Sequence, residues 1–384
     1  MLKWFSLVEV KELNSQIDNK IMFGSYKKED VIFLLKDVSD FQLEGTIESR
    51  EKQIQLGRHY SETLPIEYQP PASYIQLFRE TLMEYKEKVA LCTGIVAEQI
   101  YQLKGEDTVL VSLARAGTPV GALIKRYLKE RYNKELPHYS VSIIRDRGLD
   151  ENAIRYIIEK HPNKNIQFID GWTGKGAISI ELTKACQAVY EKFGIRLDDT
   201  LAVLADPGHC TTLYGTREDF LIPSACLNST VSGLVSRTVL NCDIIGQKDF
   251  HGAKFYRELA ESDLSNEYLD AITNEFPHIF VEAKQRAIQL QTRKEEANFQ
   301  GMQDVLRIKE EFQIETTHYI KPGVGETTRV LLRRVPWKIL MKDIESPFVK
   351  HILMLAKERN VEIVHYPEMS YTCCGLIKKV ERRQ

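Results

Sequence analysis

Residues 166–180 read Ile-Gln-Phe-Ile-Asp-Gly-Trp-Thr-Gly-Lys-Gly-Ala-Ile-Ser-Ile, and this stretch decides the fold that we expect. An apolar strand runs into a glycine-rich turn that begins with Asp170, and a helix starts where the turn ends. Such a turn surrounds an anion with backbone N–H groups and the positive end of a helix. We therefore interpret residues 173–177 as a phosphate-binding loop, with a turn that binds no ligand as the simpler alternative.

Two common phosphate-binding motifs do not fit this stretch. The P-loop needs a glycine where the chain has Ile169, and it needs Ser or Thr where Gly176 follows the Gly174-Lys175 pair. The dinucleotide-binding motif needs a third glycine where Ser179 stands. The loop is therefore neither a P-loop nor a dinucleotide-binding loop.

The stretch resembles instead the 5′-phosphate loop of type I phosphoribosyltransferases, in which one or two acids precede a Thr-Gly turn. The resemblance implies that Asp170 contacts ribose hydroxyls, or Mg²⁺ through water. Gly171 replaces the second acid of the family, which leaves the need for the metal open, and an N-cap or turn acid is the alternative for Asp170. The resemblance assigns the 5′-phosphate to Thr173, Gly174, Lys175, Gly176 and Ala177.

Two earlier loops occur in the order of that family. A buried-type strand over 109–113 ends in Arg115, Ala116 and Gly117, and a strand over 139–144 opens into Arg145 and Arg147. The resemblance implies that Arg115, Ala116, Gly117 and Arg145 bind pyrophosphate. It makes Asp170, Arg115 and Arg147 the catalytic residues, with solvated arginines as the alternative.

A further loop, Asp206-Pro-Gly-His-Cys210, follows the apolar strand over 201–204. We expect Asp206, His209 and Cys210 to shape the pocket of a base-like acceptor. Alternatively, Cys210 is a nucleophile, because the whole chain also resembles tellurite- and stress-resistance proteins of which some carry the label cysteine protease. In an extended segment His209 and Cys210 point to opposite sides, so a partner such as His251 would be needed.

Strands and helices alternate between residues 108 and 206, which predicts an α/β fold with a parallel sheet and helices on both faces. A long helix over 74–101 precedes this region, and a short helix over 29–36 is expected near the start. We divide the chain into an N-terminal appendage (1–29), a phosphoribosyltransferase-like domain (30–295), a helical connector (296–314) and a small α/β sandwich (315–384).

The last segment differs in charge from the rest of the chain. Residues 316–384 carry 13 Lys and Arg against 7 Asp and Glu, although the whole chain has a net charge of −2. This segment resembles the Pelota-type RNA-binding module, and a solvated basic helix is the alternative. The resemblance assigns RNA contacts to Gly325, Glu326, Thr327, Arg329, Arg333, Arg334 and Lys338.

The composition also bears on the cellular compartment in which we expect the protein. There is no apolar run of about 18 residues, and seven cysteines without a Cys-x-x-Cys pair favour a reducing environment. We expect a cytoplasmic protein with no membrane partner and leave its oligomeric state open.

The sequence interpretation is a phosphoribosyltransferase that uses phosphoribosyl pyrophosphate, Mg²⁺ and a base-like acceptor. Its alternatives are a cysteine protease using Cys210 and a non-catalytic phosphoribosyl-ligand sensor that binds RNA.

Overall fold

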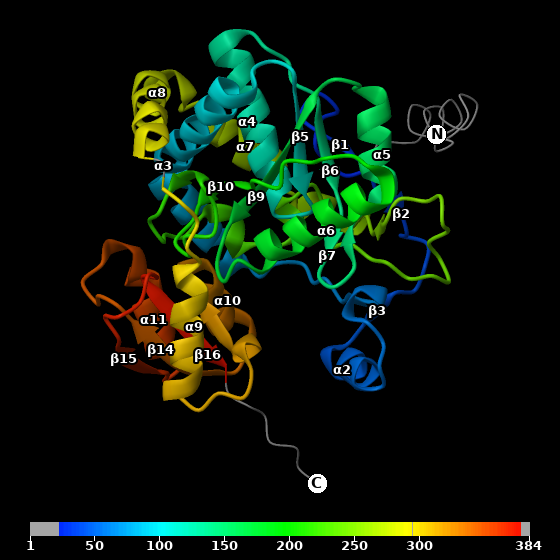
Figure 1. Ribbon diagram of the computed structural model, residues 1–384. Coiled ribbons are helices and arrows are strands. Elements are labelled where there is room, and N and C mark those ends of the chain that lie inside the picture. The colour runs from blue at the N-terminus through cyan, green and yellow to red at the C-terminus, as the bar shows by residue number, and fades with distance from the viewer. Residues whose placement is uncertain (1–22, 294, 378–384) are drawn as a thin grey trace.

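The computed structural model describes residues 23–293 and 295–377, so most of the predicted appendage lies outside the described residues. A large body is built on one sheet, and a smaller module formed by residues 300–377 packs against one edge of that sheet (Figure 1). None of the helices within the described ranges has the length and apolar character needed to cross a membrane.

The sheet of the body has six strands, and every neighbouring pair is parallel. The prediction of an α/β fold with a parallel sheet is therefore confirmed. All the strands end at the same edge, where their following loops meet. The order across the sheet is β1 (Ile32–Phe33), β6 (His138–Val141), β5 (Thr108–Leu113), β9 (Asn165–Trp172), β10 (Ala202–Ala205) and β11 (Leu213–Thr216).

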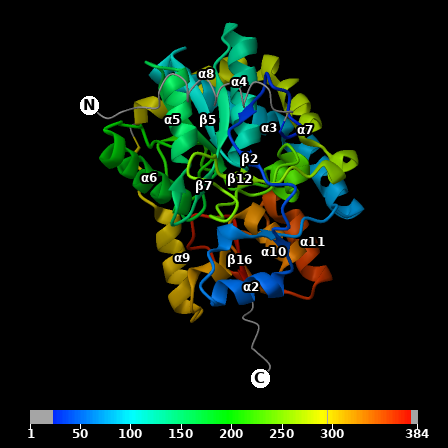
Figure 2. The same cartoon turned by 90° about the vertical axis from the view of Figure 1, so that its right-hand side faces the viewer.

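Helices cover both faces of this sheet, because alternate side chains of its buried strands point to opposite sides. In β5, the side chain of Leu110 belongs to the apolar core on one face of the sheet, whereas Val109 and Val111 belong to the core on the opposite face. Figure 2 shows both layers from another side. The helices on the face of Leu110 are α3 (Ala72–Lys104), α4 (Gly117–Tyr132), α7 (Ser265–Thr273) and α8 (Phe276–Arg293). The helices on the opposite face are α5 (Glu151–Lys160) and α6 (Ala177–Phe193).

The predicted short helix over 29–36 is wrong. Ile32 and Phe33 pair with Tyr139 and Ser140 of β6, and Leu34 is fully buried. Adding a strand to the sheet edge buries this apolar segment, which outweighs its weak helical pattern. The next short elements are β2 (Lys36–Asp37), β3 (Glu44–Gly45), α2 (Ile47–Gln55), η1 (Tyr60–Glu62) and β4 (Leu64–Pro65).

Short elements and loops complete the body. A two-stranded hairpin follows β6, and the segment between β11 and α7 is mostly irregular. These elements are β7 (Ile143–Ile144), β8 (Gly148–Leu149), η2 (Pro223–Cys226), η3 (Ser229–Val231), β12 (Gly252–Ala253) and η4 (Arg257–Ser262).

The C-terminal module has a four-stranded mixed sheet with helices, so the prediction of a small separate α/β domain holds at this level. Cys373 and Cys374 are both fully buried in β16 and belong to different apolar clusters. The strand order is β13 (Ile320–Pro322), β16 (Cys373–Ile377), β14 (Pro336–Met341) and β15 (Glu362–His365). The other elements are α9 (Gln300–Glu311), η5 (Thr317–Tyr319), α10 (Val324–Arg333), η6 (Pro347–Val349) and α11 (Lys350–Glu358).

Candidate active site at the carboxyl edge of the sheet

The loops after β9 and β10 lie directly against one another. The Thr173 hydroxyl donates to the carboxylate of Asp206, and the Thr173 N–H donates to the Ala205 carbonyl at 3.1 Å. The predicted phosphate loop and the predicted acceptor loop therefore form one structural unit, in which Asp206 is fully buried.

The C-terminal module covers the predicted phosphate loop. Lys175 Nζ donates to the carbonyls of Thr317 at 2.5 Å and Ile320 at 3.0 Å, and the Tyr371 hydroxyl donates to the Gly174 carbonyl at 3.0 Å. Burial lowers the pKa of Lys175 to about 8. Gly176, with φ of 79°, lets the chain turn into α6 at Ala177. The loop fastens the module to the body, and its assignment to a phosphate stays a prediction.

Arg115 and its neighbours Ala116 and Gly117 stand where β5 passes into α4. The Arg115 guanidinium donates to the Val235 carbonyl at 3.1 Å and lines a cavity between body and module. Burial lowers its pKa from the ordinary value of arginine. Ala116 lines the same cavity, whereas Gly117 is buried at the start of α4.

The predicted mobile basic loop is a hairpin with fixed partners. The carboxylate of Glu181 accepts the N–H groups of Asp146 and Gly148, both at 3.1 Å. Arg147 forms an ion pair with Glu62 at 2.8 Å, and Arg145 donates its backbone N–H to Tyr60. Neither Arg145 nor Arg147 lines the cavity of Arg115, so the structure does not bring the three arginines to one site.

Asp170 has few partners at the end of β9. Its carboxylate accepts the N–H of Gly171 at 2.7 Å, and burial raises its pKa to about 7. Within residues 23–293 and 295–377, no group of three or more His, Cys, Asp and Glu side chains could hold a metal ion. A single carboxylate that favours its proton is a poor ligand for Mg²⁺, and the expected metal stays a prediction.

Cys210 is held by the Asp206 turn. The Asp206 carboxylate accepts the N–H groups of Cys210 at 2.8 Å and Thr211 at 3.1 Å, and it also pairs with Arg217. The Cys210 sulfur lies beside the N-terminus of α6, because a Cβ on Gly176 would come within 3.1 Å of it. Cys210 is only 4% exposed, and burial raises the pKa of its thiol to about 12.

The connector and the module cover this cysteine. The His209 carbonyl accepts the N–H groups of Asn298 at 3.1 Å and Phe299 at 2.9 Å, and the N–H of Gly301 donates to Gly208 at 3.0 Å. The Phe299 ring lies against Gly176. Cys210 therefore lies beneath the segment that joins the two parts of the chain.

The structure does not pair Cys210 with a histidine ring. His209 has φ of 54°, and burial lowers its pKa. The His251 ring hydrogen-bonds the Ser142 hydroxyl at 2.9 Å instead. Among the described cysteines, none has a thiol hydrogen-bonded to an imidazole.

Helix α10, which carries most of the predicted RNA contacts, faces the body. Arg329 donates to the Ala225 carbonyl at 3.1 Å, and Arg333 donates to the Cys226 carbonyl at 3.0 Å and to Asn228 at 2.8 Å. The remaining positions are Gly325 in the cavity wall, Glu326 paired with Arg329, buried Thr327, exposed Arg334, and Lys338 paired with Glu362.

Sequence reasoning missed the residues that hold the two parts together. Asp219, Tyr371 and Phe299 each contact a segment far away along the chain, and no local motif marks them. The apolar sequence around these residues predicts that they are buried, but it does not specify which distant segment they contact.

A family model described as tellurite-like stress resistance cysteine protease StiP matches residues 24–273, and a PELOTA RNA binding domain model matches residues 299–379. The chain belongs to the StiP family. A StiP relative from Acinetobacter baylyi (strain ATCC 33305 / BD413 / ADP1), named cysteine protease StiP, is 33% identical over 369 residues, which cover 93% of this chain and 94% of the relative. The expected resemblances to stress-resistance proteins and to Pelota modules are confirmed.

The StiP match corrects the predicted activity. We expected a phosphoribosyltransferase, and therefore a transferase that binds phosphoribosyl pyrophosphate, but both the family and the relative are named as cysteine proteases. The Thr-Gly turn misled the interpretation, because a glycine-rich turn before a helix suits an anion and equally suits a tight contact with another segment, as Gly174 makes with Tyr371. Phosphoribosyl pyrophosphate and a base have no support as partners.

Proposed function

We propose that this protein is a cysteine peptidase with Cys210 as its nucleophile, and that the conformation described here is a latent one. The observation that carries the proposal is the position of the Cys210 sulfur beside the N-terminus of α6, at the sheet edge where ligand sites of α/β folds lie. The names of the family and of the relative support it.

The N-terminus of α6 supplies a means of activating the thiol. A helix of 17 residues carries a partial positive charge at its first turn, and this charge stabilises a thiolate. Burial opposes ionisation in the covered state and raises the pKa of Cys210 to about 12. Exposure of the sulfur to water removes the cost of burial and leaves the favourable helix end.

The covering contacts explain why the thiol is latent. Phe299 and Gly301 bind the Gly208-His209 turn, and Tyr371 binds the neighbouring Gly174. Release of these contacts uncovers Cys210 and frees the turn that carries His209. We propose His209 as the base, because its φ of 54° shows that the turn is not the extended segment in which neighbouring side chains point to opposite sides.

In the released state the thiolate attacks the peptide carbonyl, and the amine leaves with a proton from the imidazolium of His209. Water, deprotonated by the same imidazole, hydrolyses the acyl-enzyme and regenerates the thiol. Backbone N–H groups at the first turn of α6 are available to stabilise the oxyanion.

Casein hydrolysis by the full chain tests the proposal. Wild type is compared with Tyr371→Phe, which removes one covering hydrogen bond, and with Tyr371→Phe combined with Cys210→Ala. We expect the first variant to hydrolyse casein faster than wild type and the double variant to be inactive. Cys226→Ala, at another buried cysteine, is the matched control and keeps its activity. Activity that survives Cys210→Ala, or no activity in wild type and Tyr371→Phe alike, overturns the proposal.

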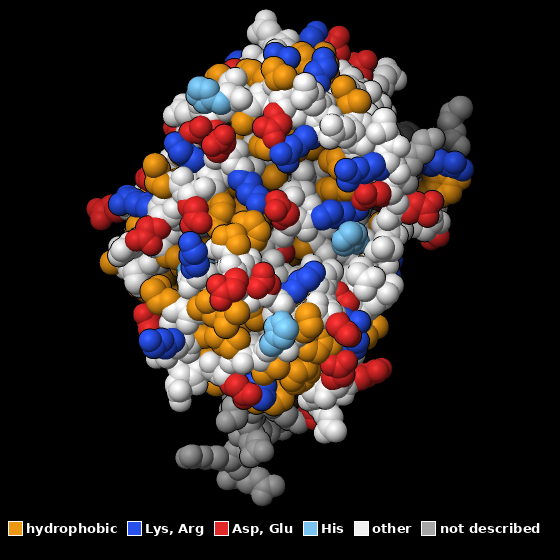
Figure 3. All heavy atoms as spheres, turned by 90° about the vertical axis from the view of Figure 1, so that its left-hand side faces the viewer, with side chains coloured by type: hydrophobic (Ala, Val, Ile, Leu, Met, Phe, Trp, Pro, Cys, Tyr) orange, Lys and Arg blue, Asp and Glu red, His pale blue; other side chains and the backbone are white. Residues whose placement is uncertain are grey.

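We also propose that the C-terminal module binds RNA, a second function favoured by the PELOTA match over residues 299–379. In the docked state Arg329 and Arg333 of α10 contact the body, whereas Arg334, which follows the helix, is exposed. On the face shown in Figure 3, positive and negative side chains are interspersed without one continuous basic patch. Gel-shift titration with a kinked RNA stem at rising salt is the test, and retention that does not weaken with salt contradicts it.

A further inference from the structure

The cavity between the body and the module lies next to the Asp206 turn, because Pro207 of that turn is among its lining residues. We propose that this cavity binds a compact organic anion, a phosphate or carboxylate joined to a flat apolar group, and that the bound anion holds the module against the body. Residues of both parts line the cavity, among them Arg115 and Trp172 from the body and Arg329 and Gly325 from α10. This inference is independent of whether Cys210 is catalytic.

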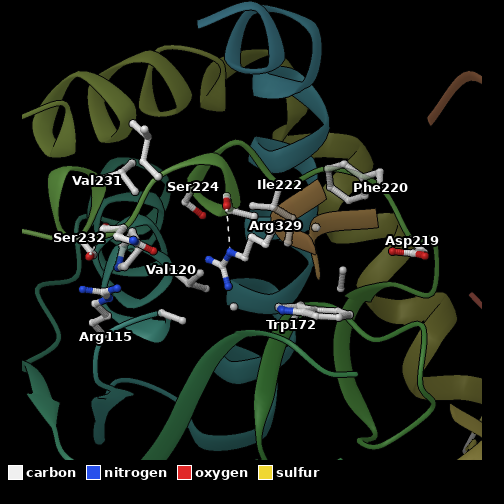
Figure 4. Close-up of a pocket in the computed structure, with 18 of the residues that line it drawn as sticks. Arg115, Val120, Trp172, Asp219, Phe220, Ile222, Ser224, Val231, Ser232 and Arg329 are labelled. Carbon is white, nitrogen blue, oxygen red and sulfur yellow. Dashed lines mark hydrogen bonds between the residues drawn. The ribbon is translucent and has the colours of Figure 1, made fainter. Parts of the chain in front are cut away.

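Two guanidinium groups supply the anion-binding part. Arg115 and Arg329 enter the same space from different domains (Figure 4). Arg115 uses one N–H group on the Val235 carbonyl, and Arg329 uses Nε on the Ala225 carbonyl and Nη1 on Glu326. Because a guanidinium carries five N–H groups, both retain donors for a ligand.

Only one of the two cations has a carboxylate partner, because Arg329 pairs with Glu326 at 3.0 Å. Arg115 has no ion pair among the described residues, although Glu67 and Tyr256 influence it from a distance. Asp219 also reaches the cavity, but its carboxylate accepts the N–H groups of Val324 and Thr372. Burial is the main cause that lowers the pKa of Arg115; Glu67 and Tyr256 oppose it, and repulsion from Arg329 is a smaller contribution that also lowers the pKa. An anion between them removes that repulsion.

The remaining wall is apolar and aromatic. Trp172 and Phe220 line the right half of the cavity in Figure 4, with Val120, Ile222 and Val231 completing the wall. A hydrated inorganic anion leaves these surfaces without a partner, whereas a ring or other flat apolar group packs against them. The combination of cations with this wall therefore selects an organic anion.

The size of the cavity favours a small ligand. Its volume is about 90 Å³, well below the roughly 300–1,000 Å³ of sites for drug-sized ligands, so the ligand is a single compact group. Because the two arginines come from different domains, a ligand that bridges them binds the docked arrangement more tightly than a separated one. Binding therefore stabilises docking by mass action.

Calorimetric titration of the full chain with phenyl phosphate tests the site. A parallel titration with benzoate tests a carboxylate in place of the phosphate. Inorganic phosphate and benzyl alcohol supply the charge and the ring separately. We expect at least one aromatic anion to bind at least tenfold more tightly than either separate part, and preference between the two anions identifies the head group. Arg115→Gln and Arg329→Gln should each weaken that binding at least tenfold, whereas Arg196→Gln, at an exposed arginine outside the cavity lining, leaves it unchanged.

A second variant separates loss of the site from loss of the fold. Ala116→Leu adds apolar bulk to the cavity wall and keeps both arginines, so it should abolish binding while the thermal unfolding midpoint of the unliganded protein stays close to that of wild type. Equal affinity for phenyl phosphate and phosphate, binding by neither aromatic anion, or full binding by Ala116→Leu overturns the proposal.

Discussion

The carboxylate of Asp219, three residues beyond the end of β11, accepts the backbone N–H of Val324 at the start of α10 at 2.9 Å. Its second oxygen accepts the N–H of Thr372 at 2.8 Å. One buried side chain of the body thus binds a helix end and a loop of the module. A carboxylate at a helix N-terminus also interacts favourably with the helix dipole, so Asp219 is a central residue of the docked arrangement.

Substitution of Asp219 by alanine should weaken docking. The change leaves the buried N–H of Val324 and the partly buried N–H of Thr372 without acceptors, and an unsatisfied buried group costs about 1–3 kcal/mol. We expect urea denaturation to show a loss of about 2 kcal/mol or more, together with faster proteolysis in the connector near residue 295. Asp243→Ala, at an exposed aspartate, is the control. If the two variants lose the same stability, Asp219 does not hold the module.

Asp170 should make stability depend on pH. Its folded pKa of about 7 lies above its ordinary value because of burial, so the folded state binds more protons than the unfolded state between about pH 4 and pH 7. Stability contributed by the protonated group is therefore present at low pH and is lost as the pH rises through 7.

Urea denaturation of wild type and Asp170→Asn at pH 5 and pH 8 measures this effect. The asparagine keeps an acceptor for the Gly171 N–H and cannot ionise. We expect wild type to lose more stability than the variant between the two values. Asp219, whose pKa burial raises to about 6, contributes in the same direction to both proteins and cancels from the comparison. Parallel losses would show that Asp170 ionises normally in the folded protein.

Alkylation rates should report whether Cys210 is covered. A thiol with a pKa near 12 contributes almost no thiolate at pH 8, and Cys210 is also shielded from reagents. We expect iodoacetamide to modify exposed Cys242 first and Cys210 much later, as read by peptide mass spectrometry. Lys175→Ala removes the bonds to Thr317 and Ile320 and should accelerate modification of Cys210 selectively. Equal acceleration at Cys186, in α6, would indicate general unfolding instead.

RNA affinity should depend on exposed cations more than on those of the docked face. Arg334→Gln is expected to lower affinity and the salt slope, because the group is free to meet a phosphate. Arg333→Gln should have a smaller effect, since its guanidinium already donates to Cys226 and Asn228. The opposite ranking in a salt-dependent binding titration would mean that RNA binds the separated module.

Local patterns predicted most of the central strands and helices of the body. The apolar runs and amphipathic stretches predicted β5, β9, β10, α3 and α6, because hydrophobic periodicity depends only on neighbouring residues. The same reasoning located the loops at the sheet edge, since parallel strands end together. It failed for β1, whose two residues become a strand only by pairing with β6.

Which groups of the loops at the carboxyl edge remain exposed depends on contacts between residues far apart in the sequence, and no local pattern contains these contacts. Lys175 meets Ile320 across 145 residues, and Gly174 meets Tyr371 across 197. These contacts make the predicted phosphate loop part of the junction between body and module and cover Cys210. They also bring Arg115 and Arg329 into one cavity. A motif specifies which groups a loop offers, whereas the free energy of packing two domains decides which groups remain available to a ligand.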